Sequence, residues 1–242
     1  MTILKILTLN VKNYIDFKSF GKETAFISER NLEISERMIK LSPDIFVLTE
    51  VNPERFEAAR TKLEAHHFII YYAKHNGSTK SCVLIGIKDT EKLRVTAHSE
   101  EFPSYPNKKL LLSHKKFNLL GLHCAASSVA EEFHKPLLRW IEKNNTNAED
   151  FLVIGDFNLD TDYDDKYARD YFEEFKKMAE KYDAYHTVKP KNRPEERATF
   201  IAGTRIDRIF TNLAVESLEH DRKTFRGLTD HYAVIATLKI GL

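Results

Sequence analysis

Hydrophobic runs that end abruptly in polar residues recur along the chain, and the clearest of them covers residues 151–159. Its apolar part, residues 151–154, leads directly into Gly-Asp-Phe-Asn, which predicts a strand buried on both faces with a polar end. Asp156 and Asn158 are two residues apart, so their side chains point the same way while the chain stays extended. This pair suits the binding of a nucleophilic water and a negatively charged oxygen, although a strand end capped by an Asx turn explains it equally well.

Apolar spacing elsewhere predicts alternating strands and helices at first, then a run of strands, and then helices again. The expected strands cover residues 3–11, 44–48, 68–73, 81–88, 93–98, 109–114, 117–123, 151–154, 208–211 and 231–239. The expected helices cover residues 29–41, 54–65, 126–144 and 164–181, and residues 189–197 are expected to form a polar loop. Two mixed sheets packed face to face with helices outside satisfy this order, as an α/β fold in one domain of residues 1–242.

Composition and charge are those of an ordinary globular chain. Of the 242 residues, 42% are hydrophobic and 30% are charged, the formal net charge is +1, and the sequence pI is about 7.8. This balance gives no general field that attracts a polyanion, so nucleic acid would have to be held by local basic clusters. The sequence shows no signal-peptide pattern and no membrane-spanning stretch, and its two cysteines are too few for a disulfide scaffold. We therefore expect a cytoplasmic protein.

Polar residues occupy the ends of several expected strands, where a buried strand has no structural need for them. They are Asn10, Glu50, His123, Asp156 with Asn158, and Asp207, together with Asp230-His231 just before the final strand. Any one of them is more often a turn or a cap than part of a site. Together they offer hard oxygen ligands for Mg²⁺, imidazoles for proton transfer and amides for phosphate oxygens. The set therefore indicates hydrolysis of a phosphate ester.

These residues and their neighbours resemble the endonuclease/exonuclease/phosphatase superfamily, which includes DNase I-like nucleases, abasic-site endonucleases, inositol-phosphate 5-phosphatases and neutral sphingomyelinases. The motifs that carry the resemblance are Leu9-Asn10-Val11, Leu48-Thr49-Glu50, Gly121-Leu122-His123, Gly155-Asp156-Phe157-Asn158, Arg205-Ile206-Asp207-Arg208 and Thr229-Asp230-His231. They stand in family order from one end of the chain to the other. The resemblance implies a four-layer α/β/β/α sandwich of two packed mixed sheets with outer helices.

The resemblance also implies a metal site. Glu50 matches the principal Mg²⁺ ligand of the family, and Asn10 and Asp230 are expected close to the metal, for which Mn²⁺ is an expected substitute. Mg²⁺ keeps most of its waters and accepts one or two protein carboxylates, so a sparse set of ligands is sufficient. Its expected work is to neutralise the charge that develops on the phosphoryl oxygens and the leaving group.

Catalysis is expected from two histidines and their partners. His231 resembles the general base or electrostatic partner of the phosphate, oriented by Asp207, because a carboxylate on one ring nitrogen sets the tautomer. By the same resemblance, Asp156 positions the attacking water and Asn158 holds a phosphate oxygen. His123 matches the second histidine of the DNase I-like and phosphatase branches, as a phosphate-binding group or general acid. The sequence leaves open which histidine does which work.

Two departures from the family motifs indicate to which branch of the superfamily the chain is more similar. Abasic-site endonucleases usually carry a tyrosine-containing motif where this chain has Gly-Leu-His-Cys, which favours the DNase I-like and phosphatase branches. Ile206 stands where a tyrosine is common in some branches, so stacking or a phenol hydrogen bond is not expected there.

Local basic clusters are the expected contacts to the rest of the substrate. The candidates are Arg222, Lys223, Arg226 and Lys189, which precede the last two motifs and would bind phosphates beyond the scissile one. The pair Lys108-Lys109 is interpreted as a solvated face. Asp160, Asp162 and Asp164 have calcium-loop spacing, but the glycine and glutamate of such a loop are missing, which favours an acidic helix start.

The sequence thus predicts a Mg²⁺-dependent hydrolase of phosphodiester bonds, foremost a nuclease that acts through metal-assisted attack of water, with a monomer favoured. An alternative within the same chemistry is a phosphatase or phosphodiesterase for a small or lipid-linked ester such as an inositol phosphate. The modest net charge leaves this alternative open. A third hypothesis is a non-catalytic binding protein on the same fold. A long basic channel leading from Glu50 and His231 would favour nucleic acid, and a closed pocket would favour a compact ester.

Overall fold

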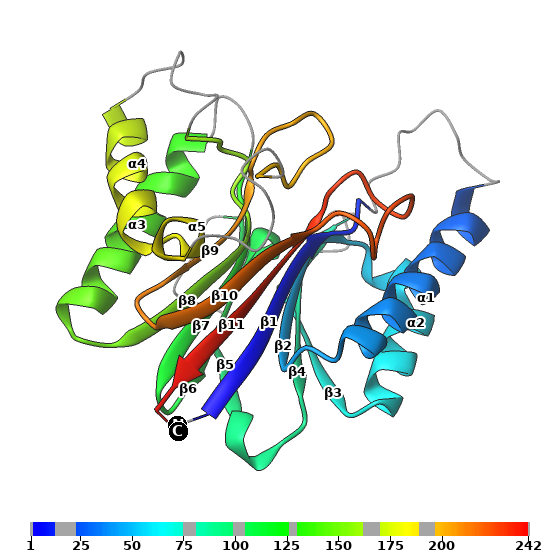
Figure 1. Ribbon diagram of the computed structural model, residues 1–242. Coiled ribbons are helices and arrows are strands. Elements are labelled where there is room, and N and C mark those ends of the chain that lie inside the picture. Colours follow the sequence, from blue (N-terminus) through cyan, green and yellow to red (C-terminus); the bar gives the residue numbers. More distant parts are fainter. Residues whose placement is uncertain are drawn as a thin grey trace.

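Two mixed β-sheets face each other in the computed structural model, and helices cover their outer faces (Figure 1). The structure describes residues 2–12, 23–74, 81–98, 105–125, 130–161, 170–188 and 197–241. This arrangement of helix layer, sheet, sheet and helix layer confirms the predicted α/β sandwich.

The larger sheet has six strands in the order β10-β11-β1-β2-β4-β3. Their bounds are β1 Thr2–Asn10, β2 Ile45–Val51, β3 Phe68–Tyr72, β4 Cys82–Lys88, β10 Ala214–Asp221 and β11 Ala233–Ile240. Strands β1 and β2 run parallel, and the other neighbours are antiparallel. The C-terminal ends of β1 and β2, the two central strands, therefore lie side by side.

The smaller sheet has five strands in the order β5-β6-β7-β8-β9. Their bounds are β5 Val95–His98, β6 Lys109–His114, β7 Phe117–His123, β8 Asp150–Asp156 and β9 Asp207–Thr211. Strands β7 and β8 run parallel, whereas β6 and β7 form an antiparallel hairpin. This sheet thus repeats the plan of the larger one, with a parallel pair flanked by antiparallel strands.

The helices form the two outer layers. Helices α1 (Glu23–Leu41) and α2 (Pro53–Ala65) cover the larger sheet, and α3 (Ala130–Thr146) and α4 (Asp170–Tyr182) cover the smaller one, followed by the short α5 (Ala184–Thr187) (Figure 1). The start of α2 is set by Asn52, whose side chain accepts the backbone N–H of Arg55, and by proline at the first helical position. No helix in the described part of the chain is long and apolar enough to cross a membrane.

Alternate residues of the inner strands belong to different cores. In β1, Ile6 packs between the two sheets, whereas Leu7 packs in the core under α1 and α2. In β8, Leu152 packs between the sheets, whereas Phe151 packs in the core under α3 and α4. Because both faces of these strands are buried, their sequences are unbroken apolar runs rather than alternating ones.

Several predicted bounds were wrong, and some elements were not predicted. The first helix begins at Glu23 rather than residue 29, β5 begins at Val95 after the 3₁₀ turn η2 (Glu91–Leu93), and the last strand begins at Ala233. Strand β10 and helix α5 were not predicted at all. The strand β10 lies at the sheet edge, where Glu216 and Glu219 are exposed and a register shift between Val215 and Ser217 interrupts the alternation, so only its pairing with β11 defines it.

Candidate active site

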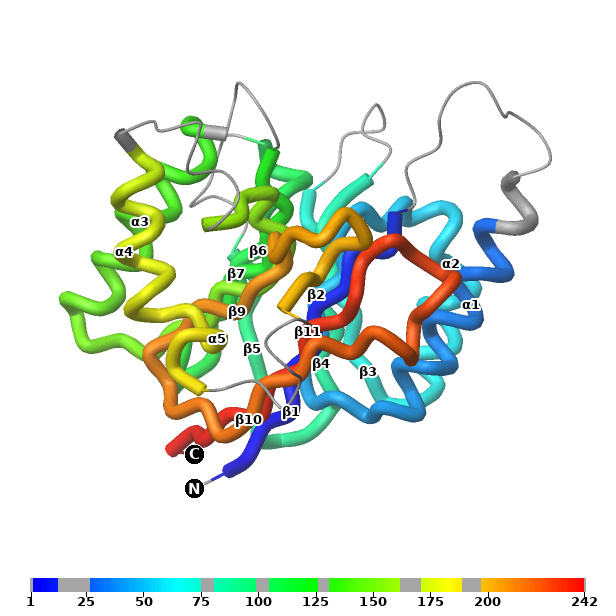
Figure 2. The backbone as a smooth tube through the Cα atoms, turned by 45° about the horizontal axis from the view of Figure 1, so that its top comes forward, coloured from blue at the N-terminus to red at the C-terminus, as the bar shows by residue number. Residues whose placement is uncertain are grey.

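Polar residues from both sheets meet at one edge of the sandwich. Strands β1, β2, β7 and β8 end there, and β9 and β11 begin there because they are antiparallel to their neighbours. In the smaller sheet, the register places His123 beside Asp156 and Asp156 beside Asp207. In the larger sheet, the hydroxyl of Thr229 donates to the carbonyl oxygen of Asn10 (2.7 Å), which holds the loop between β10 and β11 against the end of β1 (Figure 2).

Asn10, at the end of β1, links the two sheets. Its buried side-chain amide donates to Oε1 of Glu50 (3.0 Å) and to Oδ2 of Asp156 (2.9 Å), and its oxygen accepts the backbone N–H of Lys12 (2.9 Å). Glu50 and Asp156 come from different sheets, so one amide group holds two carboxylates in position. The structure therefore places Asn10 at the predicted metal site, where its nitrogen rather than its oxygen faces the carboxylates.

The backbone near these carboxylates adopts conformations that few residues tolerate. Glu50 (φ 57°) and Asn158 (φ 49°) are left-handed, which costs roughly 1 kcal/mol each for a residue with a side chain. At Gly155 (φ 145°), a Cβ atom would lie 1.9 Å from the carbonyl oxygen of Leu122, so only glycine fits. Such conformations are concentrated at functional sites, where they direct side chains that a regular strand would point elsewhere.

Asp156 and Asn158 form the Asx turn that the sequence offered as the structural explanation of this pair. Oδ1 of Asp156 accepts the backbone N–H of Asn158 (2.8 Å), and the side-chain amide of Asn158 donates to the carbonyl oxygen of Cys124 (2.8 Å). The turn coexists with the site, because the other oxygen of Asp156 is bound by Asn10. Asn158 keeps one amide hydrogen and its oxygen available for a ligand.

His231 and Asp207 form a buried pair. Nδ1 of His231 lies 2.8 Å from Oδ2 of Asp207, and the backbone N–H of Asp207 donates to the hydroxyl of Thr199 (2.9 Å). Burial alone lowers the pKa of His231, but the carboxylates of Asp207, Asp156 and Asp230 outweigh this effect and raise it to about 9. The ring is therefore an imidazolium at neutral pH, with Nδ1–H donated to Asp207 and Nε2–H left for a ligand.

Asp156 carries a charge that its surroundings only partly compensate. Burial and the neighbouring carboxylate of Asp207 raise its pKa to about 7, against the opposing effects of His231 and of its hydrogen bonds from Asn10 and Asn158. A carboxyl group with a pKa near neutrality can exchange a proton with water under physiological conditions.

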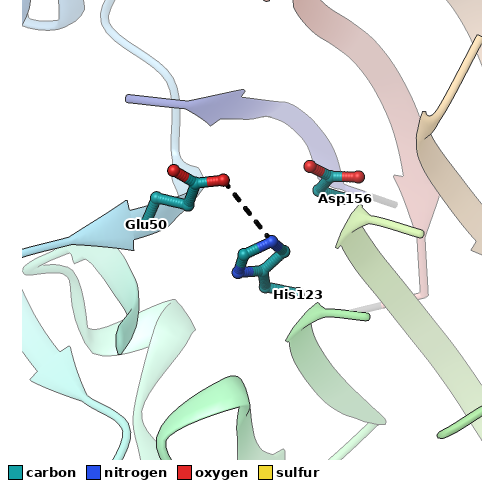
Figure 3. A group of neighbouring side chains, drawn as sticks. All are labelled: Glu50, His123 and Asp156. Carbon is teal, nitrogen blue, oxygen red and sulfur yellow. Dashed lines mark ion pairs between the residues drawn. The ribbon is translucent and has the colours of Figure 1, made fainter. Parts of the chain in front are cut away.

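His123 lies between Glu50 and a lysine that the sequence interpretation missed. Nε2 of His123 is 3.6 Å from Oε1 of Glu50 (Figure 3). Nδ1 of the same ring is 3.1 Å from Nζ of Lys108. Burial, Lys108 and His231 lower the pKa of His123 to about 3, so its ring is neutral. The interpretation of Lys108 as part of a solvated face was wrong, because its ammonium group reaches into the site.

Asp230 lies at the margin of the site rather than beside Glu50. Its Oδ1 is 4.0 Å from Nε2 of His231, and its Oδ2 forms an ion pair with Lys12, whose side chain is largely exposed. The structure thus brings Glu50, His123, Asp156, Asp207 and His231 together and leaves Asp230 at the rim.

The predicted phosphate contacts Arg222, Lys223 and Arg226 belong to the loop between β10 and β11 that leads to the site. Lys223 and Arg226 are exposed, and the guanidinium of Arg222 lies 4.7 Å from the ring centroid of Tyr232. Lys189 lies outside the described residues.

Asp160 is the only one of the three calcium-spaced aspartates among the described residues, since Asp162 and Asp164 lie outside them, so the predicted acidic helix start stays a prediction. It is fully buried and accepts the backbone N–H of Arg205 (2.8 Å) and the guanidinium of Arg197 (3.1 Å). Nearby, Asp183 binds the buried side chains of Arg205 (2.6 Å) and Arg208 (2.7 Å). This charge cluster anchors the segment before Asp207 against the end of α4 and thereby supports the site from behind.

The residues of the site fit a divalent cation. Ligand atoms of Glu50, His123 and Asp156 lie within 4.8 Å of one another, as do those of Asp156, Asp207 and His231. Oδ1 of Asp207 is buried without a hydrogen-bond partner among the described residues, and the raised pKa of Asp156 indicates uncompensated negative charge. A cation bound near Glu50 and Asp156 would neutralise that charge with the oxygen ligands that Mg²⁺ prefers.

Two packed sheets with carboxylates and histidines at one edge define a class of metal-dependent phosphoester hydrolases. The chain belongs to the endonuclease/exonuclease/phosphatase family, whose model matches residues 7–231. Members of this family include nucleases, phosphodiesterases and phosphatases and act on phosphoester bonds. The family membership confirms the resemblance that the motifs indicated. No curated protein sequence matches the chain significantly.

Solved structures with the same fold cover nearly the whole chain. TDP2 from Caenorhabditis elegans is 17% identical, with a TM-score of 0.67 over 98% of this chain and 74% of that one. An AP endonuclease from Archaeoglobus fulgidus is 16% identical, with a TM-score of 0.71 over 99% and 100% of the two chains. The catalytic domain of human Nocturnin with a bound sulfate anion is 16% identical, with a TM-score of 0.69 over 98% and 94%. At such identities these likenesses establish the fold alone, and the choice of branch stays a prediction.

Proposed function

We propose that the protein is a Mg²⁺-dependent hydrolase that cleaves phosphodiester bonds in nucleic acid. The observation that carries this proposal is the position of Asp156, which is held by Asn10 and Asn158 between Glu50 and the His231–Asp207 pair. This arrangement combines a cation site, a carboxyl group able to exchange a proton, and a positively charged hydrogen-bond donor. Water needs these three groups to attack a phosphodiester.

Glu50 is the proposed principal metal ligand, and Asn10 holds its carboxylate apart from that of Asp156. When bound, Mg²⁺ would supply positive charge beside the phosphoryl oxygens. Asp230 is farther away and its Lys12 ion pair competes for its carboxylate, so its part as a ligand is proposed as secondary.

The remaining roles follow from the protonation states. Asp156 orients the attacking water and takes up its proton, which its raised pKa favours. His231, held as an imidazolium by Asp207, donates Nε2–H to a phosphate oxygen rather than acting as the base. Asn158 donates its free amide hydrogen to a second phosphate oxygen. His123 donates a hydrogen bond from Nε2 to the substrate.

An apolar turn beside His231 favours nucleic acid over a small sugar phosphate. The ring of Phe200 lies 4.9 Å from that of His231, and the next residue, Ile201, is 67% exposed. Backbone hydrogen bonds from Ile201 to Asp230 (2.9 Å) and from Tyr232 to Thr199 (2.7 Å) hold this turn on both sides of His231. An exposed apolar surface next to the scissile phosphate suits the flat face of a base and has no counterpart in an inositol phosphate.

The test is cleavage of plasmid and single-stranded DNA in Mg²⁺ and in EDTA, for the wild type and for His231→Ala. We expect cleavage that needs both Mg²⁺ and His231. The variant His66→Ala removes an exposed histidine at the end of α2 and should behave as the wild type. Absence of cleavage above the His231→Ala background would refute the proposed nuclease activity. A small phosphate ester would then be the proposed substrate, and the net charge of +1 is compatible with it.

The apolar turn can be tested separately. Ile201→Ser should raise KM for an oligonucleotide about fivefold, because covering the exposed isoleucine with a base removes apolar surface from water and is worth on the order of 1 kcal/mol. The same variant should leave KM unchanged for an oligonucleotide with an abasic spacer next to the scissile phosphate. Ile69→Ser, at an exposed isoleucine of β3, is the matched control. Equal effects on both substrates would show that the turn does not bind a base.

The two buried cysteines, Cys82 and Cys124, are both free thiols, which fits a reducing compartment. We propose the cytoplasm as the location on this ground.

A further inference from the structure

Lys108 contacts His123 because of the hairpin that carries both residues. The register of β6 and β7 pairs Lys109 with Leu122, and one step farther Lys108 stands opposite His123 at the edge of the sheet. Lys108 ends the 3₁₀ turn η3 (Pro106–Lys108), which begins after Tyr105 in a left-handed conformation (φ 58°). The turn brings Nζ of Lys108 to 3.1 Å from Nδ1 of His123.

This contact determines which ring nitrogen of His123 carries the proton. An ammonium group has only donors, so Nδ1 must accept from Lys108. Burial holds the pKa of Lys108 below its ordinary value, and the carboxylates of Glu50 and Asp156 oppose this shift. A ring whose Nδ1 accepts a hydrogen bond carries its one hydrogen on Nε2, the nitrogen that lies 3.6 Å from Oε1 of Glu50.

A nitrogen that carries a hydrogen has no lone pair for a metal. The cluster of Glu50, His123 and Asp156 otherwise has the composition of a site for Zn²⁺ or another metal that binds imidazole, with two carboxylates and one histidine. With Nδ1 engaged by Lys108 and Nε2 protonated, only oxygen ligands remain. Divalent metals with higher affinity for nitrogen lose the ligand that would favour them over Mg²⁺.

We propose that Lys108 is a selectivity residue, which withholds His123 from the metal and thereby keeps the site for hard, oxygen-binding cations. The proposal rests on the cation site of the proposed function, but not on nuclease activity. It also assigns His123 the part of a hydrogen-bond donor from Nε2 and removes it from the candidates for general base.

Three variants isolate the effect. Lys108→Met removes the ammonium group and keeps the length of the side chain, Lys108→Arg keeps a cationic donor, and Lys116→Met changes an exposed lysine in the turn of the same hairpin. For each protein, Zn²⁺ and Mg²⁺ affinities are measured by competition with a chromophoric chelator and by calorimetry. The ratio of the two affinities is the readout, because loss of a positive charge strengthens binding of both cations.

Lys108→Met should raise the preference for Zn²⁺ over Mg²⁺ roughly 10- to 100-fold, the range found when partners of metal ligands are changed. Lys108→Arg and Lys116→Met should keep the wild-type ratio. Adding His123→Gln to Lys108→Met should abolish the gain, since the new ligand is then missing. An unchanged ratio in Lys108→Met, or a gain that survives the loss of His123, would overturn the proposal.

The tautomer of His123 can be measured in the wild-type protein, without any variant. Ring ¹⁵N shifts of His123 in the metal-free wild-type protein at neutral pH should show a neutral imidazole with hydrogen on Nε2. Hydrogen on Nδ1 would overturn the proposal even if Lys108→Met failed to fold. These binding and spectroscopic measurements stand apart from DNA cleavage. An inactive protein with the expected tautomer and ratio would refute the nuclease alone.

Discussion

Replacing Asp207 by asparagine tests whether this carboxylate keeps His231 charged. The two side chains lie 2.8 Å apart, and both are buried. In the folded protein the pKa of His231 is about 9, against 6.5 for an ordinary histidine. That difference corresponds to roughly 3 kcal/mol in favour of the charged ring. In Asp207→Asn the shape is kept and the charge is lost, so burial should bring the pKa of His231 to 6.5 or below.

The sign of the stability effect follows from the raised pKa. The charged pair stabilises the fold fully below about pH 6.5, and this contribution is lost as the pH rises through about 9. Asp207→Asn should therefore lower the free energy of unfolding by an amount on the order of 3 kcal/mol at pH 6, and by much less at pH 10. At pH 7.5 a pKa of 6.5 leaves about a tenth of the rings charged, so DNA cleavage should fall roughly tenfold or more.

The assay is an NMR titration of the His231 ring in metal-free protein, combined with urea unfolding at pH 6 and pH 10. Asp230→Asn is the matched control, because Asp230 contributes less to the pKa of His231 and lies 4.0 Å from it. The control should titrate closer to the wild type than Asp207→Asn does. If His231 in Asp207→Asn still titrates above pH 8, the carboxylate is not what keeps the ring charged and the reasoning is refuted.

Three further predictions concern the backbone, the metal and the substrate. Gly155→Ala should lower the free energy of unfolding by roughly 3 kcal/mol or more, because the new Cβ meets a carbonyl oxygen of β7; an unchanged urea midpoint would contradict this. Glu50→Gln should shift the Mg²⁺ titration of activity to higher concentrations, and an unaltered titration would remove Glu50 from the ligands. Exchanging Arg222, Lys223 and Arg226 for glutamine should raise KM on DNA and flatten its salt dependence, and no change in either would exclude that loop from binding.

The chemistry-bearing strand ends could be predicted because the strands are buried on both faces. An unbroken apolar run such as residues 151–154 has no reason to stop in Gly-Asp-Phe-Asn unless the polar residues are used. Elements with weaker internal signals were missed. Residues 214–221 form β10 only because β11 offers a partner, and Asp160 is buried only because Arg197 and Arg205 surround it. Both depend on tertiary neighbours that no local pattern contains.

Contacts within a sheet and contacts between sheets differ in how far sequence can predict them. Lys108 and His123 belong to one hairpin, and its tight turn at Lys115-Lys116 already sets the register that pairs them. The sequence could therefore have predicted this contact, because the register of the hairpin, extended by one residue, pairs Lys108 with His123. Asn10 and Asp156 belong to different sheets, and the distance between them depends on the angle and the alignment at which the two sheets pack over their shared core. The proposed metal selectivity thus depends on a contact within one hairpin, which the local sequence determines. The assembly of the site depends on how the two sheets pack, which the local sequence does not determine.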